Sequence, residues 1–190
     1  FLQEYIVAAG GNLVVHGPGC GPHHIDITVG IHGHRAARVV IRGEDAAVVF
    51  LGGVVSRQVT HLCQKAAGEI ALQYFKTNLS VELKADHTPV TKADRECESR
   101  IVDILRAEFP DHGVLGEEFG EQPGNSSARW IIDPIDGTKN FIRGIPFFAT
   151  LIALEEDDEI TAGVMYAPAI DELLYAQKGQ GAFAIGKRHY

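Results

Sequence analysis

Trp130-Ile131-Ile132-Asp133-Pro134-Ile135-Asp136-Gly137-Thr138 holds the strongest structural signals in this chain. Its first three residues are bulky and apolar, which predicts a buried strand. Because proline has no backbone N–H for a ladder, we expect the strand to stop at the Asp-Pro pair. The Asp-Gly-Thr end predicts a tight turn that opens a helix, whose free N–H groups suit a phosphate oxygen. Paired carboxylates beside such amides are typical of a Mg²⁺-assisted phosphate site.

The alternative is that Asp-Pro and Asp-Gly are ordinary turn dipeptides. A second motif argues against coincidence. The apolar pair Val114-Leu115 is followed by Gly116-Glu117-Glu118, which predicts another strand that ends in carboxylates. The two motifs stand a dozen or so residues apart, and each predicts carboxylates at the end of a strand. A coincidence of two such motifs is a poor explanation.

Gly116-Glu117-Glu118 followed by Trp130–Phe141 resembles the inositol monophosphatase family of metal-dependent phosphatases. The resemblance extends from about Ser56 to Tyr190. It implies an α/β (α+β) fold, the first half of a layered sandwich in which helices pack on a largely antiparallel sheet.

The resemblance also implies a role for each site residue. The implied Mg²⁺ ligands are three carboxylates and one backbone carbonyl, from Glu117, Asp133, Asp136 and Ile135. Glu118 would be an outer-sphere neighbour, and the amides of Gly137 and Thr138 would bind phosphate. Asp94 would pair with Thr138 to orient the attacking water, and Glu117 counts among the catalytic residues as well. The structural alternative for Asp94 is a capping role at a helix start.

The implied reaction is Mg²⁺-dependent hydrolysis of a small phosphate monoester by a metal-activated water. Inositol monophosphate and histidinol phosphate are nearly equal as substrates, although Phe141–Leu154 is more similar to the histidinol-phosphate branch. One alternative is a truncated, non-catalytic remnant that acts as a metal-binding or interaction module. Another is a bisphosphate nucleotidase or sugar bisphosphatase of the same superfamily.

Members of the family carry a second α/β half with a Trp-Asp-x-x-Ala-Gly type motif, whose aspartate completes the metal site. Here the single tryptophan is Trp130, which is followed by Ile131. If the chain is complete, we expect one ligand fewer and weaker Mg²⁺ binding. The chain begins with Phe1 rather than methionine, which leaves open that the sequence is a fragment.

Composition limits the class of protein. The 190 residues are 45% hydrophobic and 22% charged, as in a globular domain. The net charge of −8 argues against nucleic acid or an anionic membrane as a partner. The three cysteines form no Cys-x-x-Cys pair, which favours a reducing compartment. We expect no signal peptide and no membrane span, and therefore predict a cytoplasmic protein. The expected partner is a small phosphate monoester, and a homodimer remains open.

Residues 1–53 show no family match, so we divide the chain into an unassigned N-terminal segment, 1–53, and a phosphatase-like domain, 54–190. The segment contains short apolar runs at 37–41 and 46–51 that predict strands. It also contains residues that suit a transition metal, namely Cys20, His23, His24, His32 and His34. Their spacing fits no standard zinc finger, and surface polar residues are the favoured interpretation.

Apolar spacing predicts a helix over 56–75 with Ser56 as its N-cap, and a second helix from Thr91 to about Phe109. Residues 81–90 predict a hairpin from which Lys84 and Asp86 could reach the site, although a solvated hairpin explains them equally well. Strands are expected at 148–154, 160–166 and 172–176, with the acidic run 155–159 as a hairpin tip. Short turns between them imply antiparallel pairing.

Overall fold

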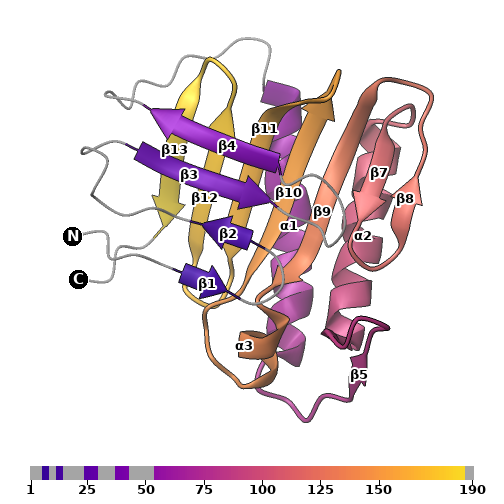
Figure 1. The fold of residues 1–190 in the computed structure, drawn as a ribbon, viewed down its shortest axis with the longest axis vertical. Coiled ribbons are helices and arrows are strands. Elements are labelled where there is room, and N and C mark those ends of the chain that lie inside the picture. The colour runs from indigo at the N-terminus through magenta and orange to yellow at the C-terminus, as the bar shows by residue number, and fades with distance from the viewer. Residues whose placement is uncertain (1–5, 9–11, 15–23, 30–36, 43–53, 187–190) are drawn as a thin grey trace.

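The computed structural model describes residues 6–8, 12–14, 24–29, 37–42 and 54–186 (Figure 1). A seven-stranded sheet with the order β13-β12-β11-β10-β9-β7-β8 forms its centre. The strands are β7 (Gly113–Gly116), β8 (Gly120–Gln122), β9 (Ala128–Asp136), β10 (Ala149–Glu156), β11 (Glu159–Ala167), β12 (Glu172–Gln177) and β13 (Gly181–Gly186). Within this sheet β7 and β9 pair in parallel, and the other neighbours pair antiparallel. The expected helix-covered, largely antiparallel sheet is confirmed.

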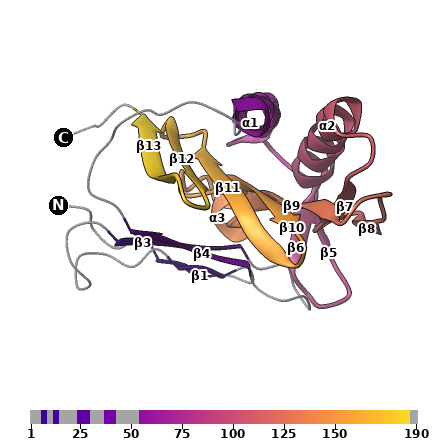
Figure 2. The same cartoon turned by 90° about the horizontal axis from the view of Figure 1, so that it is seen from above.

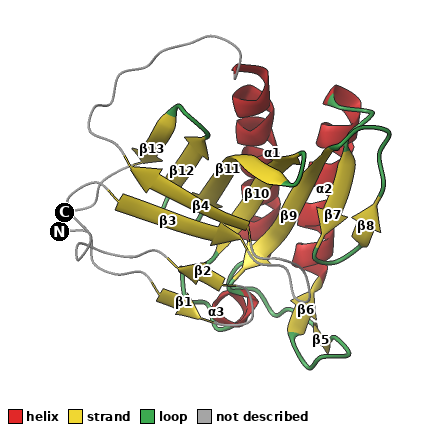
Figure 3. Cartoon of the chain, turned by 45° about the horizontal axis from the view of Figure 1, so that its top comes forward, coloured by secondary structure: helices red, strands yellow, loops and turns green. Residues whose placement is uncertain are grey.

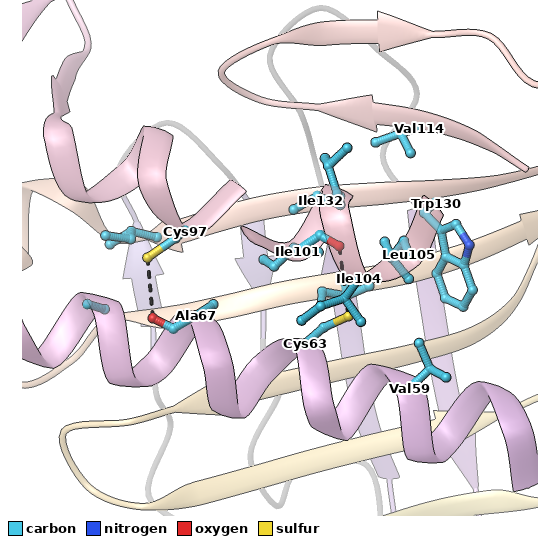
Figure 4. Close-up of a cluster of buried hydrophobic side chains, with 14 of the residues drawn as sticks. Val59, Cys63, Ala67, Cys97, Ile101, Ile104, Leu105, Val114, Trp130 and Ile132 are labelled. Carbon is cyan, nitrogen blue, oxygen red and sulfur yellow. Dashed lines mark hydrogen bonds between the residues drawn. The ribbon is translucent and has the colours of Figure 1, made fainter. Parts of the chain in front are cut away.

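The helices α1 (Val54–Tyr74) and α2 (Lys92–Glu108) lie side by side on one face of the sheet (Figure 2). Both helices contribute buried, mostly small side chains to one hydrophobic cluster: Cys63, Ala67, Ala71, Ala93, Cys97 and Ile101. The thiol of Cys97 donates to the carbonyl of Ala67 at 3.3 Å, and that of Cys63 donates to the carbonyl of Ile101 at 4.0 Å (Figure 4). In the part of the chain that is described, no helix has the length and apolarity needed to cross a bilayer.

The central strands are apolar on both faces. Successive side chains of a strand point to opposite sides, and apolar residues occupy both. On β9, Trp130 and Ile132 face the helices, and Ile131 joins a second buried cluster with Leu115 and Leu151 on the other face. Both faces of the central strands therefore contribute to the core.

Smaller elements surround this sheet (Figure 3). The hairpin predicted at 81–90 is confirmed as β5 (Val81–Leu83) and β6 (Pro89–Thr91), and a short helix, α3 (Thr138–Ile142), follows β9. Two further hairpins lie on the sheet face opposite α1 and α2 (Figure 2), made of β1 (Ile6–Ala8) with β2 (Asn12–Val14) and β3 (His24–Val29) with β4 (Ala37–Arg42). The strand expected at 37–41 is thus confirmed.

Some expectations for the N-terminal segment lie outside the described residues. These are the strand at 46–51 and the residues Cys20, His23, His32 and His34. Of His24, only its place in β3 is described.

Two local predictions were wrong. Helix α1 already begins at Val54, so Ser56 lies inside the helix and is not its N-cap. Val55 precedes Val59 by one turn, which continues the apolar spacing of the helix upstream of Ser56. Strand β9 does not stop at Pro134 but runs on to Asp136. The register against β10 shifts between Ala149 and Leu151, and Pro134 has no paired position in the ladder, so its missing N–H is tolerated there.

Candidate active site

The ends of the neighbouring strands β7 and β9 bring the first carboxylates together. The two strands run parallel with Gly116 opposite Ile132, so Glu117 and Asp133 follow at the same edge of the sheet. The N–H of Glu117 also donates to the Ile132 carbonyl at 3.1 Å, which extends the pairing by one bond. Asp136 ends β9 three residues later. The parallel pairing therefore gathers acidic side chains that lie more than a dozen residues apart in the sequence.

The two aspartates at this edge, Asp133 and Asp136, are buried and only partly satisfied. Asp133 Oδ1 and Asp136 Oδ2 are buried and have no hydrogen-bond partner. Burial, followed by the nearby charges of Glu117 and Asp136, raises the pKa of Asp133 well above its usual range. Burial and Glu117 raise the pKa of Asp136 to about 7. Buried charges are normally paired or bound to a cation, so this edge is electrostatically incomplete without a positive partner.

Lys84, on the β5–β6 hairpin, supplies one positive charge. Its ammonium donates to Glu117 at 2.9 Å and to Glu118 at 2.6 Å. Burial alone would lower the pKa of Lys84, but the bonds to Glu118 and Glu117 outweigh it and raise that pKa. Burial raises the pKa of Glu118 to about 7 despite the lysine. Asp86 is exposed and accepts hydrogen bonds from the Thr88 amide and hydroxyl within the hairpin.

Asp94 makes contacts that correspond to both of its expected roles. Its Oδ2 accepts hydrogen bonds from the Thr91 amide at 2.8 Å and the Thr91 hydroxyl at 2.6 Å, which confirms the capping box at the start of α2. Its Oδ1 lies 3.4 Å from the Thr138 hydroxyl, which also donates to the Ile135 carbonyl at 3.1 Å. Burial raises the pKa of Asp94. One carboxylate therefore caps a helix and reaches the loop after β9.

Gly137 makes the turn between β9 and α3. Its φ of 86° lies in the left-handed region, where a residue with a Cβ is strained. Its carbonyl accepts from the amides of Asn140 and Phe141, which starts the helix. The predicted turn followed by a helix is confirmed, although the helix has only five residues.

The donor set fits a hard divalent cation. Among the described residues, no three His, Cys, Asp or Glu side chains already have the arrangement of metal ligands, and Glu117 is engaged by Lys84. Nevertheless, the unpartnered oxygens of Asp133 and Asp136 are the oxygen donors that Mg²⁺ prefers. With Glu117 beside them, these residues could hold Mg²⁺ once the lysine is displaced.

Glu98 is a neighbour of the site that the sequence did not reveal. It is fully buried on α2, and its carboxylate accepts the amides of Glu118 at 2.8 Å and Phe119 at 3.0 Å. The available indication was its position on the apolar side of the helix, next to Cys97 and one turn before Val102.

Comparison with known proteins identifies the family of this chain. Residues 55–189 match the model of the Inositol monophosphatase family. A histidinol-phosphatase of Chlorobaculum parvum is 49% identical over 121 residues, which cover 63% of this chain and 47% of that protein. An inositol-1-monophosphatase of Mesorhizobium japonicum is 48% identical over 112 residues, covering 58% and 42% respectively. The crystal structure of the extragenic suppressor protein suhB from Bartonella henselae superposes with a TM-score of 0.66 at 42% identity, covering 68% of this chain and 51% of that one. The chain thus spans about half the length of the relatives it matches.

Proposed function

This chain belongs to the inositol monophosphatase family, and from that premise we propose that it forms the Mg²⁺-binding and phosphate-binding half of a phosphatase site. The reaction would be hydrolysis of a small phosphate monoester by water. The observation that carries the proposal is the pair of buried, unpartnered oxygens of Asp133 and Asp136 beside Glu117. Such an arrangement is costly without a cation and suited to one.

Each residue then has a distinct task. Asp133, Asp136, Glu117 and the carbonyl of Ile135 would hold Mg²⁺, which when bound lowers the pKa of water and neutralises phosphate charge. Thr138 and Asp94 would orient the attacking water through the contact between hydroxyl and carboxylate.

The remaining tasks are binding and orientation. The amides of Gly137 and Thr138 would donate to the phosphate oxygens. Glu118 would act from the outer sphere, where it shares Lys84 with Glu117. Phosphoryl transfer needs little covalent chemistry from a protein, so positioning and charge neutralisation are sufficient.

The substrate we propose is histidinol phosphate or inositol monophosphate. Relatives with these two kinds of name are almost equally similar to the chain, at 49% and 48% identity. We place histidinol phosphate first because Phe141–Leu154 is more similar to that branch. We propose that the site belongs to a domain of residues 54–190. Cys63 and Cys97 are both free thiols, which favours a reducing compartment, so we also propose a cytoplasmic protein.

Phosphate release from both substrates tests the proposal, with Mg²⁺ and with a chelator. We expect Mg²⁺-dependent turnover that Asp133→Asn abolishes and that Glu108→Gln, an exposed change on α2, leaves intact. A panel of nucleotide and sugar bisphosphates tests the bisphosphatase alternative. A folded chain that binds Mg²⁺ but releases no phosphate would overturn the catalytic proposal and favour a non-catalytic metal-binding module.

A further inference from the structure

The turn between β7 and β8 presents both acidic residues of the second motif. It consists of Glu117, Glu118 and Phe119, which follow Gly116 at the end of β7. Beneath the turn lies Glu98, whose side chain is 0% exposed. Its Oε2 accepts the Glu118 amide at 2.8 Å and its Oε1 accepts the Phe119 amide at 3.0 Å. A single carboxylate therefore satisfies two successive backbone donors of the turn.

Gly116 shows how closely the backbone approaches this carboxylate. A Cβ at Gly116 would lie 1.8 Å from Glu98 Oε1, so a side chain cannot be accommodated there without displacing Glu98. On its other side the turn is tied to β9, because the Glu117 amide donates to the Ile132 carbonyl. The segment that carries Glu117 is consequently held between α2 and β9.

Helix α2 connects this turn to the rest of the site. Glu98 follows Asp94 by four residues, so both point from the same side of the helix. The capping box of Thr91 and Asp94 sets where the helix begins. The first turns of α2 therefore place the carboxylate that reaches Thr138 and the carboxylate that supports Glu117.

We propose that Glu98 is a positioning residue, which holds the β7–β8 turn so that Glu117 faces Asp133 and Asp136; this role rests on the function proposed above. Glutamate suits it for a chemical reason. A carboxylate accepts at both oxygens, whereas the amide of glutamine accepts at only one and presents a donor at the other. In Glu98→Gln one turn amide would meet an N–H group, and the turn would loosen without any loss of side-chain volume.

The test measures Mg²⁺ binding to the full chain directly by titration calorimetry, without substrate. We expect Glu98→Gln to weaken Mg²⁺ binding by about 10- to 100-fold, as is typical for losing an outer-sphere partner of a metal site. Gly116→Ala should also weaken Mg²⁺ binding, because the added Cβ would displace the Glu98 carboxylate from the turn. Asp103→Asn removes an exposed carboxylate from the same helix and should leave Mg²⁺ binding unchanged.

Amide hydrogen exchange provides a second readout that does not depend on metal. In Glu98→Gln the Glu118 and Phe119 amides should exchange faster, while the Ile152 amide in the middle of the sheet should keep its protection. Mg²⁺ affinity equal to that of the unmodified chain, or faster exchange at Ile152 as well, would overturn the positioning role. If Glu98→Gln does not fold, Gly116→Ala decides the question. An unmodified chain that binds no Mg²⁺ would overturn the proposed function, and this role with it.

Discussion

Asp133 is a buried carboxylate in which one oxygen has no hydrogen-bond partner. Its environment includes Glu117 and Asp136, which add to burial in raising its pKa. A site with this character stores unfavourable electrostatic energy until a cation binds. Asp133 should therefore oppose the stability of the metal-free fold and contribute strongly to metal binding.

Asp133→Asn tests both consequences. Without Mg²⁺ we expect its thermal midpoint to lie above that of the unmodified chain, because one mutually repelling charge is gone. Its Mg²⁺ affinity should fall by more than the roughly 10- to 100-fold that follows loss of an outer-sphere partner. Calorimetry in chelator and in Mg²⁺ measures both, with Glu108→Gln as the control. A lower midpoint in chelator would show that Asp133 is stabilised by a partner rather than strained.

The Lys84 ammonium binds Glu117, one of the proposed Mg²⁺ ligands. Because an ammonium competes with Mg²⁺ for the same oxygen, Lys84→Gln should tighten Mg²⁺ binding. The Lys84–Glu117 pair is partly buried, and we expect release of Glu117 to improve Mg²⁺ affinity by about two- to five-fold, equivalent to about 0.5–1 kcal/mol. Titration calorimetry measures the change, and Lys178→Gln removes an ion pair elsewhere on the surface as the control. Weaker binding in Lys84→Gln would instead show that the lysine supports the site.

At the level of elements, the start of α2 is the feature most directly predicted from sequence. Thr91 followed by Asp94 is recognisable as a capping box because the pattern is local, and the structure confirms it. The prediction of Ser56 as an N-cap was wrong, because a serine near a helix start does not exclude a start further upstream. Pro134 was misjudged because tolerance of proline depends on what the neighbouring strand does at that point.

Thr91→Ala removes the hydroxyl that contacts Asp94 and the Ala93 amide. Loss of such a cap should lower the free energy of unfolding by about 1 kcal/mol. It should also reduce turnover, since Asp94 loses a partner that orients it toward Thr138. Urea unfolding and phosphate release measure the two effects, and Thr91→Ser, which keeps the hydroxyl, should restore most of both. Equal losses in Thr91→Ser would point to the methyl group instead.

The packing of α1 on α2 leads to a prediction about Cys63 and Cys97. Burial raises the pKa of each thiol to about 12, so at pH 8 both remain protonated in the folded chain. Since the thiolate is the reactive form, alkylation should be at least about 100-fold slower than in urea. Peptide mapping after iodoacetamide treatment follows each cysteine separately. Rapid labelling of Cys97 in the folded chain would mean that the two helices separate readily.

For the whole molecule, binding and folding should be linked. Trp130 is 1% exposed and packs against Phe109, with ring centroids 5.3 Å apart, so its fluorescence reports on the core between α2 and the sheet. If Mg²⁺ binds the folded state alone, a concentration about 100 times Kd should add about 2.7 kcal/mol to the free energy of unfolding. Urea titrations followed by this fluorescence measure it, and Asp133→Asn should show little of the gain. An equal gain in Asp133→Asn would place the bound ion elsewhere.

The local motifs were available in the sequence because they depend on neighbours along the chain. The apolar run before Asp133, the turn at Gly137, the capping box at Thr91 and the helical spacing each involve a few consecutive residues, and these features also carried the family resemblance. Tertiary structure decided how these parts meet. The parallel pairing of β7 with β9 places Glu117 beside Asp133, the hairpin brings Lys84 onto the acidic pair, and Glu98 lies under the turn. These contacts join segments far apart in sequence, and burial and charge there depend on the folded neighbours rather than on residue type.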